Sequence, residues 1–345
     1  MGKILKKSVR IAAIGAGYFS RFHYDGWRRI EGAEVVALAV RHPERAQRLA
    51  AEFGVPKVYG DVAQMLDETK PDLIDIITPP DSHLEYVRMG AERGLPMICQ
   101  KPLARTLEEA RELVEVAEGA GATLAVHENF RFMPWYQEAY RLIQNGRFGS
   151  LHTIAFRLRP GDGQGPRAYL ERQPYFQKME RFLVHETAIH FIDTFRFLMG
   201  EVKRVFAWLR RMNPVIAGED AGYILFDFVN GSSGIFDGNR LNDHVTDYPL
   251  RTMGEMWLEG SAGALRLDGS GRLWWRPHRG LEEEHKYTWK NINFGGDCTY
   301  NMEIHIFSHF TAGTPLQNDG RAYLRNLEIE EAVYRSAAEG RWVDV

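Results

Sequence analysis

Short apolar runs and amphipathic stretches alternate along the first third of the chain. The first run, Val9–Ile14, is almost entirely apolar and stops at a glycine, which is typical of a strand buried on both faces. Similar runs predict strands at residues 34–40, 73–77, 96–99 and 124–126. Helical patterns are expected between them, at about residues 18–30, 43–53, 82–93 and 106–118. This alternation predicts a mainly parallel sheet with right-handed crossover helices.

After about residue 150 the pattern changes to longer strand-like stretches separated by turn signals such as Asn230-Gly231. Strands are predicted at residues 151–158, 202–209, 222–229, 234–239, 253–258 and 272–276. Helices are expected at about residues 186–199, 300–311 and 322–338. We therefore expect an α/β domain over residues 1–127, followed by an α+β domain with a large, mainly antiparallel sheet over residues 128–345.

Composition and charge are those of an ordinary globular protein. The 345 residues are 44% hydrophobic and 26% charged, and the formal net charge is -3 with no block of like charges. This balance favours neither a nucleic acid nor an anionic membrane as partner. The only cysteines, Cys99 and Cys298, lie far apart, and no apolar run is long enough to span a membrane. We expect a soluble, cytoplasmic protein with reduced thiols.

A glycine loop follows the first predicted strand and opens the first predicted helix. It reads Gly15-Ala16-Gly17-Tyr18-Phe19-Ser20. Gly15 permits a tight turn, and Gly17 allows the backbone to approach a pyrophosphate at the positive end of the helix. Ser20 replaces the third glycine that usually allows close packing of helix on strand. The context predicts a Rossmann domain that binds NAD or NADP, with Tyr18 and Phe19 beside the cofactor.

The end of the second predicted strand bears on the choice between the two cofactors. An acidic residue usually stands there and binds the adenosine ribose, but this chain has Val40-Arg41-His42. Arg41 could bind the 2′-phosphate of NADP, or it could stack on the adenine ring in either cofactor. Both alternatives remain open at this point.

Five segments in a fixed order resemble one family of enzymes. They are the glycine loop, Thr78-Pro79-Pro80 with His83, Gln100-Lys101-Pro102-Leu103-Ala104, residues 186–193 and residues 330–336. Together they resemble the Gfo/Idh/MocA oxidoreductases over nearly the whole chain. The resemblance implies an NAD(P)-dependent dehydrogenase that acts on the CH–OH group of a carbohydrate or polyol. It also implies that Thr78, Pro79, His83, Gln100 and Lys101 lie beside the cofactor.

The resemblance further implies which residues carry the chemistry. The family's lysine of an E-K-P motif corresponds to Lys101, and the aspartate and histidine of its D-x-G-x-H motif correspond to Glu186 and His190. This chain departs from the pattern at Gln100, which replaces the glutamate, and at Glu186, which is one methylene longer than the aspartate. Hydride would pass to the nicotinamide while His190 removes the hydroxyl proton and Lys101 stabilises the developing negative charge. Glu186 would orient His190 or contact a substrate hydroxyl.

Helical geometry supports this grouping independently. At about 100° per residue, Glu186, His190 and Asp193 fall on one side of a helix, opposite an apolar stripe that includes Ile192 and Phe195. The pattern predicts a polar ridge opposite the core-facing stripe. The alternative is a solvated polar face without chemistry.

Substrate contacts are expected from residues that flank these motifs. Besides Lys101, Glu186 and His190, the candidates are Asn129, Arg131, Trp135, Arg159, Tyr175 and His185. Residues 17–23 (GYFSRFH) and 127–136 (HENFRFMPWY) resemble the subgroup that contains D-apiose dehydrogenases, so a branched pentose is a candidate substrate.

Other functions and partners complete the set of hypotheses. His185 and His190 are five residues apart, which does not suit the zincin spacing, and no metal site is expected. A non-catalytic dinucleotide sensor and an NAD-dependent glycosidase of the same family remain alternatives. Trp274-Trp275 and an uncovered sheet face suggest an oligomer contact, and we expect a homodimer or homotetramer.

Overall fold

The computed structural model describes residues 8–345, so the first seven residues of the predicted first domain lie outside the described part. The chain divides into two compact units. Of the described residues, unit 1 contains 8–129 and 299–325, and unit 2 contains 130–298 and 326–345. The sequence placed a single boundary at residue 127, whereas by contact unit 1 also takes in a segment from near the end of the chain.

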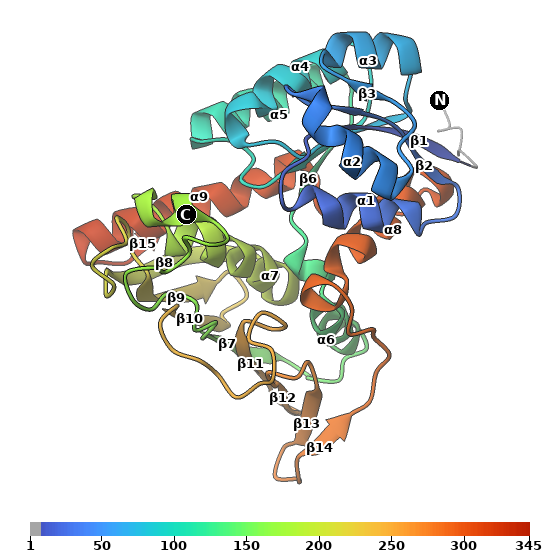
Figure 1. Ribbon diagram of the computed structural model, residues 1–345. Helices are drawn as coiled ribbons and strands as arrows, with labels where there is room; N and C mark the ends of the chain where they lie inside the picture. Colours follow the sequence, from blue (N-terminus) through green and yellow to red (C-terminus); the bar gives the residue numbers. More distant parts are fainter. Residues whose placement is uncertain (1–7) are drawn as a thin grey trace. The chain divides into compact units, whose positions relative to one another are not determined.

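Unit 1 is built on a six-stranded sheet in the order β3-β2-β1-β4-β5-β6, with every neighbouring pair parallel (Figure 1). Its strands are β1 (Val9–Ile14), β2 (Ala33–Ala39), β3 (Val58–Tyr59), β4 (Leu73–Ile76), β5 (Met97–Gln100) and β6 (Leu124–His127). Its helices include α1 (Ser20–Arg28), α2 (Pro43–Phe53), α3 (Val62–Thr69), α4 (His83–Glu92) and α5 (Leu107–Gly119). The predicted parallel α/β fold is confirmed.

Helices cover both faces of this sheet. Tyr24 of α1 and Ala46 and Ala50 of α2 pack with Ala13 and Leu38 in one buried cluster. On β4 the pleat sends neighbouring side chains to opposite faces. Asp75 bonds to α1, whereas Ile74 lies against Gly90 of α4, where an added Cβ would come within 3.0 Å of its Cδ1. The strands are therefore buried on both sides, as their apolar runs require.

The sequence pattern did not reveal β3 and α3. Strand β3 has two residues and forms only two pairs with β2, which is too short for a recognisable run. Helix α3 begins after Asp61, whose carboxylate accepts a hydrogen bond from the backbone N–H of Gln64 at 2.8 Å. This N-cap was the readable signal for the helix.

Unit 2 contains a nine-stranded sheet in the order β14-β13-β12-β11-β7-β10-β9-β8-β15. Only β7 and β10 pair in parallel, so the prediction of a mainly antiparallel sheet is confirmed. The strands are β7 (Leu151–Leu158), β8 (Val202–Arg210), β9 (Ala221–Phe228), β10 (Ser233–Asn239), β11 (Gly254–Gly260), β12 (Gly263–Leu267), β13 (Leu273–Pro277), β14 (Glu283–His285) and β15 (Val343–Asp344).

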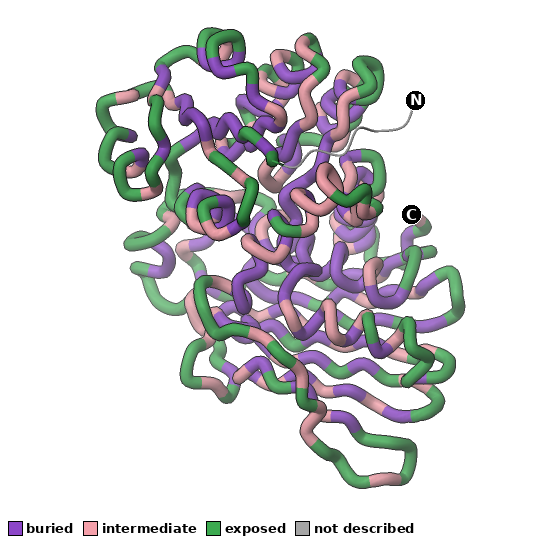
Figure 2. Tube along the Cα trace, turned by 90° about the vertical axis from the view of Figure 1, so that its right-hand side faces the viewer, coloured by how far each residue is buried: buried purple, intermediate pink, exposed green. Residues whose placement is uncertain are grey.

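One face of this sheet is covered by helices and the other is not. Phe191 and Phe195 of α7 (Ile189–Met199) pack on Phe156 and Phe226 of the sheet, and α6 (Pro134–Gln144) packs beside α7. Along the strands, buried and exposed positions alternate (Figure 2). Exposed apolar side chains on the uncovered face are Trp208, Tyr223, Ile235 and Trp257. Trp275, which the sequence suggested as a surface residue, is instead buried against Phe148.

The helix predicted at residues 186–199 begins with a π-helical turn rather than an α-helical one. Residues Leu183–Ala188 form a π-helical turn, and the α-helix starts only at Ile189. Glu219 holds the start of this turn, because its Oε1 accepts hydrogen bonds from the N–H groups of Phe182 and Val184 at 3.1 and 3.0 Å. Burial raises the pKa of the Glu219 carboxyl, and these backbone N–H groups oppose the rise.

The polar ridge on this helix is not solvated. Ile192 and Phe195 are buried as predicted, but His190 and Asp193 are also buried, at 5% and 1% exposure. The alternative of a solvated polar face is therefore wrong. The 100° projection also fails at Glu186, because that residue lies in the π-turn.

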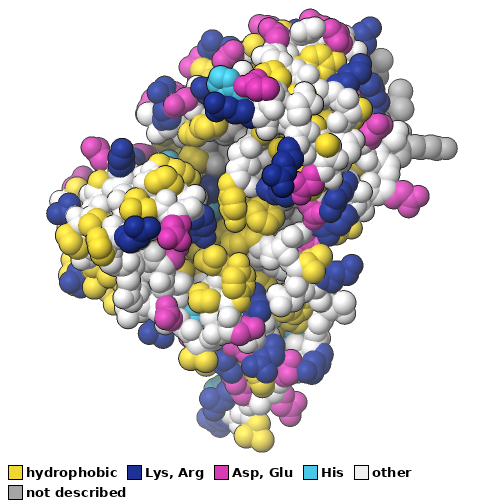
Figure 3. Space-filling view, in the orientation of Figure 1, with side chains coloured by type: hydrophobic (Ala, Val, Ile, Leu, Met, Phe, Trp, Pro, Cys, Tyr) yellow, Lys and Arg dark blue, Asp and Glu magenta, His cyan; other side chains and the backbone are white. Residues whose placement is uncertain are grey.

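The remaining helices are α8 (Cys298–Ala312) and α9 (Gly320–Glu339), close to the predicted 300–311 and 322–338. Within residues 8–345, no helix combines the length and apolar composition that a membrane crossing requires. On the face seen in Figure 3, Lys and Arg side chains are interspersed with Asp and Glu, as the composition suggested.

Candidate functional site

A groove of about 300 Å³ lies at the carboxyl ends of β1, β2 and β4 in unit 1. Gly15 and Ala16 of the glycine loop, Arg41 after β2, and Thr78 and Pro79 after β4 line it. The strand order reverses between β1 and β4, and open parallel sheets bind their ligands at this point. Four residues that the sequence assigned to cofactor binding, Gly15, Arg41, Thr78 and Pro79, therefore meet in one place.

Gly15 is required by its surroundings. Its φ is +120°, and an added Cβ would lie 2.4 Å from the carbonyl oxygen of Ile77. The hydroxyl of Tyr24 donates to the Gly15 carbonyl at 2.7 Å and fixes the turn. Gly17 has nothing within 4 Å of an added Cβ, so its backbone is open to a ligand.

Ser20, which stands where the glycine motif has its third glycine, makes a hydrogen bond within the loop. The side chain is fully buried, and its hydroxyl donates to the Gly17 carbonyl at 2.7 Å. It therefore closes the loop on the first turn of α1. The neighbouring Tyr18 is 63% exposed, and Phe19 packs edge-on to His23.

The adenosine end of the groove is basic. Arg41, His42 and Arg45 line it, and none of the described lining residues is acidic. None of these lining residues carries a negative charge that would repel the 2′-phosphate of NADP.

His83, the first residue of α4, contacts the backbone on one side of the groove. It is fully buried, and its ring nitrogens face the carbonyl oxygens of Thr78 at 2.7 Å and Leu103 at 2.9 Å. Burial lowers the pKa of His83, and the two carbonyl groups oppose that shift. His83 thereby connects the Thr78 loop with the segment that follows Lys101.

Lys101 follows the last residue of β5. Its backbone N–H donates to Oε1 of Gln100 at 2.7 Å. The amide nitrogen of Gln100 lies 3.2 Å from Nε2 of His23. Gln100 therefore uses its side chain inside unit 1, to hold the backbone of the lysine.

His190 and Glu186 belong to unit 2. The His190 ring stacks on Phe130 with centroids 3.9 Å apart and planes 4° apart, which fixes the ring orientation. Glu186 is half-buried in the π-turn. Burial alone would lower the pKa of Arg240, but Asp162, Tyr169 and Glu186 raise it above its ordinary value. The charge of Glu186 is therefore balanced in part by a buried guanidinium.

The candidate substrate residues fall into three groups. Arg131 and Arg159 are paired with carboxylates, Asp193 at 2.5 Å and Asp237 at 2.7 Å. Trp135 is fully buried against Trp289, and Asn129 is buried with its amide 3.5 Å from the hydroxyl of Thr299. Tyr175 is exposed, and His185 is partly buried with its Nδ1 2.7 Å from Glu330.

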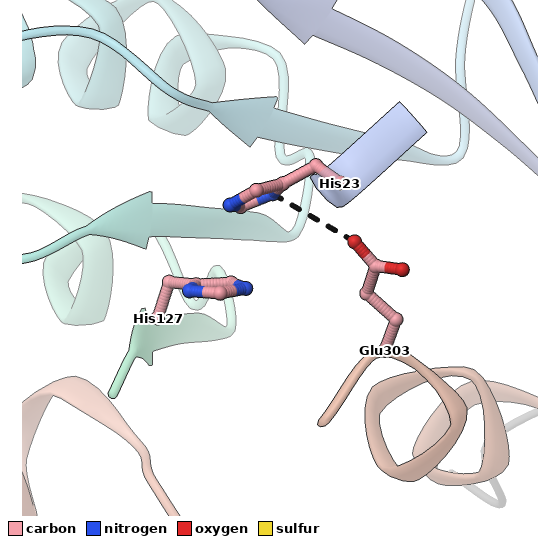
Figure 4. A group of neighbouring side chains, drawn as sticks. All are labelled: His23, His127 and Glu303. Atoms are coloured by element: carbon pink, nitrogen blue, oxygen red, sulfur yellow. Dashed lines mark ion pairs between the residues drawn. The ribbon is translucent and has the colours of Figure 1, made fainter. Parts of the chain in front are cut away.

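Two buried polar clusters were not predicted from the sequence. In unit 2, Arg240 binds Asp162 at 2.7 Å and also contacts Tyr169 and Thr187. In unit 1, His23, His127 and Glu303 place ligand-type atoms within 4.8 Å of one another (Figure 4). The available signal in unit 1 was Asp75, an isolated charge in an apolar strand.

A glycine turn at the switch point of a parallel sheet in this order is typical of dinucleotide-binding proteins. Residues 9–128 match the oxidoreductase family with an NAD-binding Rossmann fold, and residues 136–266 match the GFO/IDH/MocA C-terminal domain. The chain belongs to the Gfo/Idh/MocA family and is an NAD(P)-dependent oxidoreductase. The resemblance read from the sequence is confirmed.

Individual relatives cover nearly the whole chain. A D-apiose dehydrogenase of Paraburkholderia graminis is 35% identical over 98% of this chain and 90% of its own. A D-apiose dehydrogenase of Rhizobium rhizogenes is 31% identical over 97% and 96%. The crystal structure of an oxidoreductase from Agrobacterium radiobacter, in complex with NAD+, L-tartaric acid and magnesium, is 30% identical with a TM-score of 0.88, covering 98% of each chain.

Gly15 and Gly17 should respond differently to the same substitution. Gly15→Ala should lower the free energy of unfolding by about 1–3 kcal/mol and so lower the melting temperature. The reason is that Gly15 has a positive φ and that an added Cβ would meet the carbonyl oxygen of Ile77. Gly17→Ala should keep the wild-type melting temperature, since an added Cβ has nothing within 4 Å, but it should raise the Kd for NADH by taking up space in the glycine loop. Thermal unfolding and NADH fluorescence titration measure the two effects. An equal loss of stability in both variants would contradict the distinction between a structural role for Gly15 and a ligand-facing role for Gly17.

Proposed function

We propose that the protein oxidises a CH–OH group of a neutral sugar or polyol and passes hydride to NAD or NADP. One observation carries the proposal: the groove built on Gly15 lies in the same unit as Lys101, which follows the carboxyl end of β5. The two D-apiose dehydrogenases support a pentose, and D-apiose is the first substrate to test.

The pairing of three arginines with aspartates supports a neutral substrate. Arg131, Arg159 and Arg240 are each paired with an aspartate at 2.5 to 2.7 Å and are nearly buried. A guanidinium engaged in this way offers little net charge to a carboxylate or phosphate. Hydroxyl groups are better suited to bind beside such pairs, because they need hydrogen bonds rather than charge compensation.

Each catalytic candidate has a distinct role in the proposal. His190 accepts the hydroxyl proton at a ring nitrogen, since imidazole is the side-chain base best suited to this near neutral pH. The ammonium of Lys101 donates to the same oxygen and stabilises the charge that develops as the proton leaves. Glu186 contacts a substrate hydroxyl or orients His190. When bound, the nicotinamide supplies the hydride acceptor.

The remaining site assignments are proposals of the same kind. Gly15, Gly17, Tyr18, Phe19, Arg41, Thr78, Pro79, His83, Gln100 and Lys101 serve the cofactor. Asn129, Arg131, Trp135, Arg159, Tyr175 and His185 shape the substrate side. The buried, free cysteines Cys99 and Cys298 suit a reducing cytoplasm, which we propose as the location.

Lys101→Ala and His190→Asn should each lower kcat by about 10²–10⁴-fold, because one removes the donor that stabilises the developing charge and the other removes the proton acceptor. The assay follows reduced-cofactor absorbance with D-apiose, inositols and glucosides, using NAD and NADP in parallel. Lys203→Ala and His152→Asn are matched controls at exposed sheet positions and should keep full turnover. Near-normal turnover of either catalytic variant would refute the assignment. Release of free sugar from a glycoside without reduced cofactor would instead indicate the glycosidase.

Val40→Asp should separate the two cofactors. Val40 lines the groove where an acidic residue usually binds the adenosine ribose, and a carboxylate there repels a 2′-phosphate. We expect kcat/KM with NADP to fall about tenfold more than with NAD, which corresponds to one close unfavourable charge contact. Val40→Asn is the uncharged control and should affect both cofactors alike. An equal effect of aspartate on both cofactors would show that the 2′-phosphate binds elsewhere.

We also propose a homodimer or homotetramer formed through the uncovered sheet face. Its exposed Trp208, Tyr223 and Trp257 form the kind of apolar surface that associates in water. Light scattering should give a mass about two or four times the 39.6 kDa of one chain. Tyr223→Lys should shift the mass toward one chain, whereas Leu281→Lys, at the exposed turn between β13 and β14, should not. A wild-type monomer would contradict the proposal.

A further inference from the structure

A carboxylate is buried at the centre of the parallel sheet of unit 1. Asp75 lies in β4 with no exposed surface. Its Oδ2 accepts hydrogen bonds from Nδ1 of His23 at 2.9 Å and from the indole N–H of Trp27 at 2.8 Å. A buried charge is costly unless it is paired and hydrogen-bonded, so these two partners on α1 are what allow an aspartate there.

The hydrogen bonds determine the protonation of His23. Oε1 of Gln100 accepts the backbone N–H of Lys101 at 2.7 Å, so the amide NH₂ of Gln100 must face Nε2 of His23 at 3.2 Å. That NH₂ can only donate, and Nε2 must therefore be unprotonated. The ring proton then sits on Nδ1, where it is donated to Asp75. A continuous chain results, from Asp75 through His23 and Gln100 to the backbone of Lys101.

The same geometry argues against a metal ion among His23, His127 and Glu303. Nδ1 of His23 lies 3.8 Å from Oε1 of Glu303, and the His23 and His127 rings stack at 3.9 Å (Figure 4). A metal ligand must be deprotonated, but Nδ1 carries the proton. Moving that proton to Nε2 would set it against the NH₂ of Gln100. Metal binding at Nδ1 therefore breaks the chain.

We propose that His23 is a positioning residue for Lys101 and acts through Gln100. This inference rests on the proposed function of Lys101. His23 fixes which end of the Gln100 amide faces the lysine, and the amide oxygen then fixes the lysine backbone at the end of β5. The chain of hydrogen bonds that begins at the buried Asp75 thus determines the direction in which the Lys101 side chain extends from the end of β5. Small errors in placing a catalytic group cost much of its rate contribution.

The proposal explains why glutamine stands at position 100. A glutamate there could still accept the N–H of Lys101, but it could not donate to Nε2 of His23. His23 would then need a second proton, beside Asp75, Glu303 and the new carboxylate, with His127 stacked on its ring. Gln100 and a histidine at position 23 are consequently a matched pair, although they are 77 residues apart.

Kinetics test the role of the chain. Gln100→Met removes both amide contacts at similar size, and His23→Phe keeps the ring without its nitrogens. Each should lower kcat about tenfold or more while the KM for sugar changes less than about twofold, because the orientation of Lys101 rather than sugar binding is lost. The double variant should be no slower than the slower single variant. Unchanged kcat in Gln100→Met overturns the proposal.

Trp27→Phe is the matched control. It removes the other hydrogen bond to Asp75 and leaves the link from His23 to Gln100 intact. It should lower the melting temperature as His23→Phe does, with kcat unchanged. If Trp27→Phe lowers kcat as much as His23→Phe, the effect is a general loss of core stability and the positioning role is wrong.

A spectroscopic measurement tests the chain without turnover. In protein labelled with ¹⁵N-histidine, the His23 ring should show a protonated Nδ1 and an unprotonated Nε2. The opposite tautomer in the wild-type protein overturns the proposal. So does elemental analysis that finds one transition-metal ion per chain which Glu303→Gln removes.

The two proposals fail in different ways. If Lys101→Ala abolishes turnover but Gln100→Met and His23→Phe do not, only the positioning role is wrong. If Lys101→Ala is fully active, the proposed function is wrong, and the role of His23 in catalysis falls with it. The tautomer then reports only on the buried chain of hydrogen bonds.

Discussion

The close approach of Gly15 to the carbonyl of Ile77 is the constraint on which the rest of unit 1 depends. β1 and β4 are neighbours there, and the chain leaves them toward opposite helical layers, so only a residue without a Cβ fits between them. The gap that results opens into the groove that Gly15 and Ala16 line. Arg41 after β2 and Thr78 after β4 reach the same groove because parallel strands deliver their carboxyl ends to one edge.

Paired charge in the interior is the second organising feature, and both units contain it. In unit 1, Asp75 is held by two donors of α1 and leads to Lys101. In unit 2, Asp193 binds Arg131 and Asn326, while Asp162 binds Arg240. A buried pair contributes little to stability on its own, but leaving one partner alone is costly. Such pairs therefore hold their side chains in one arrangement.

The sequence predicted elements where their ends carry a strong local signal. Pro43 opens α2, and Gly54, in the left-handed conformation, closes it, so the predicted limits are correct to the residue. The bounds of β1 and β7 were also correct, because a glycine loop and a long alternating run mark them. The two-residue β3 has too little sequence to form a pattern. The π-turn before Ile189 escaped prediction because helical projection assumes a uniform 100° step, and what holds the turn is Glu219, more than thirty positions further along the chain.

Motif residues could be named from the sequence, but their neighbours in the folded chain could not. Gln100 and Glu186 both depart from the family pattern, and in the sequence each departure is simply a mismatch. In the folded chain Gln100 faces His23, and Glu186 lies within electrostatic reach of Arg240. In each case the partner comes from a distant part of the chain and matches the altered residue in hydrogen bonding or charge. A motif mismatch is therefore weak evidence for lost activity until its spatial neighbours are known, since a residue from elsewhere in the chain can match the change in hydrogen bonding or charge.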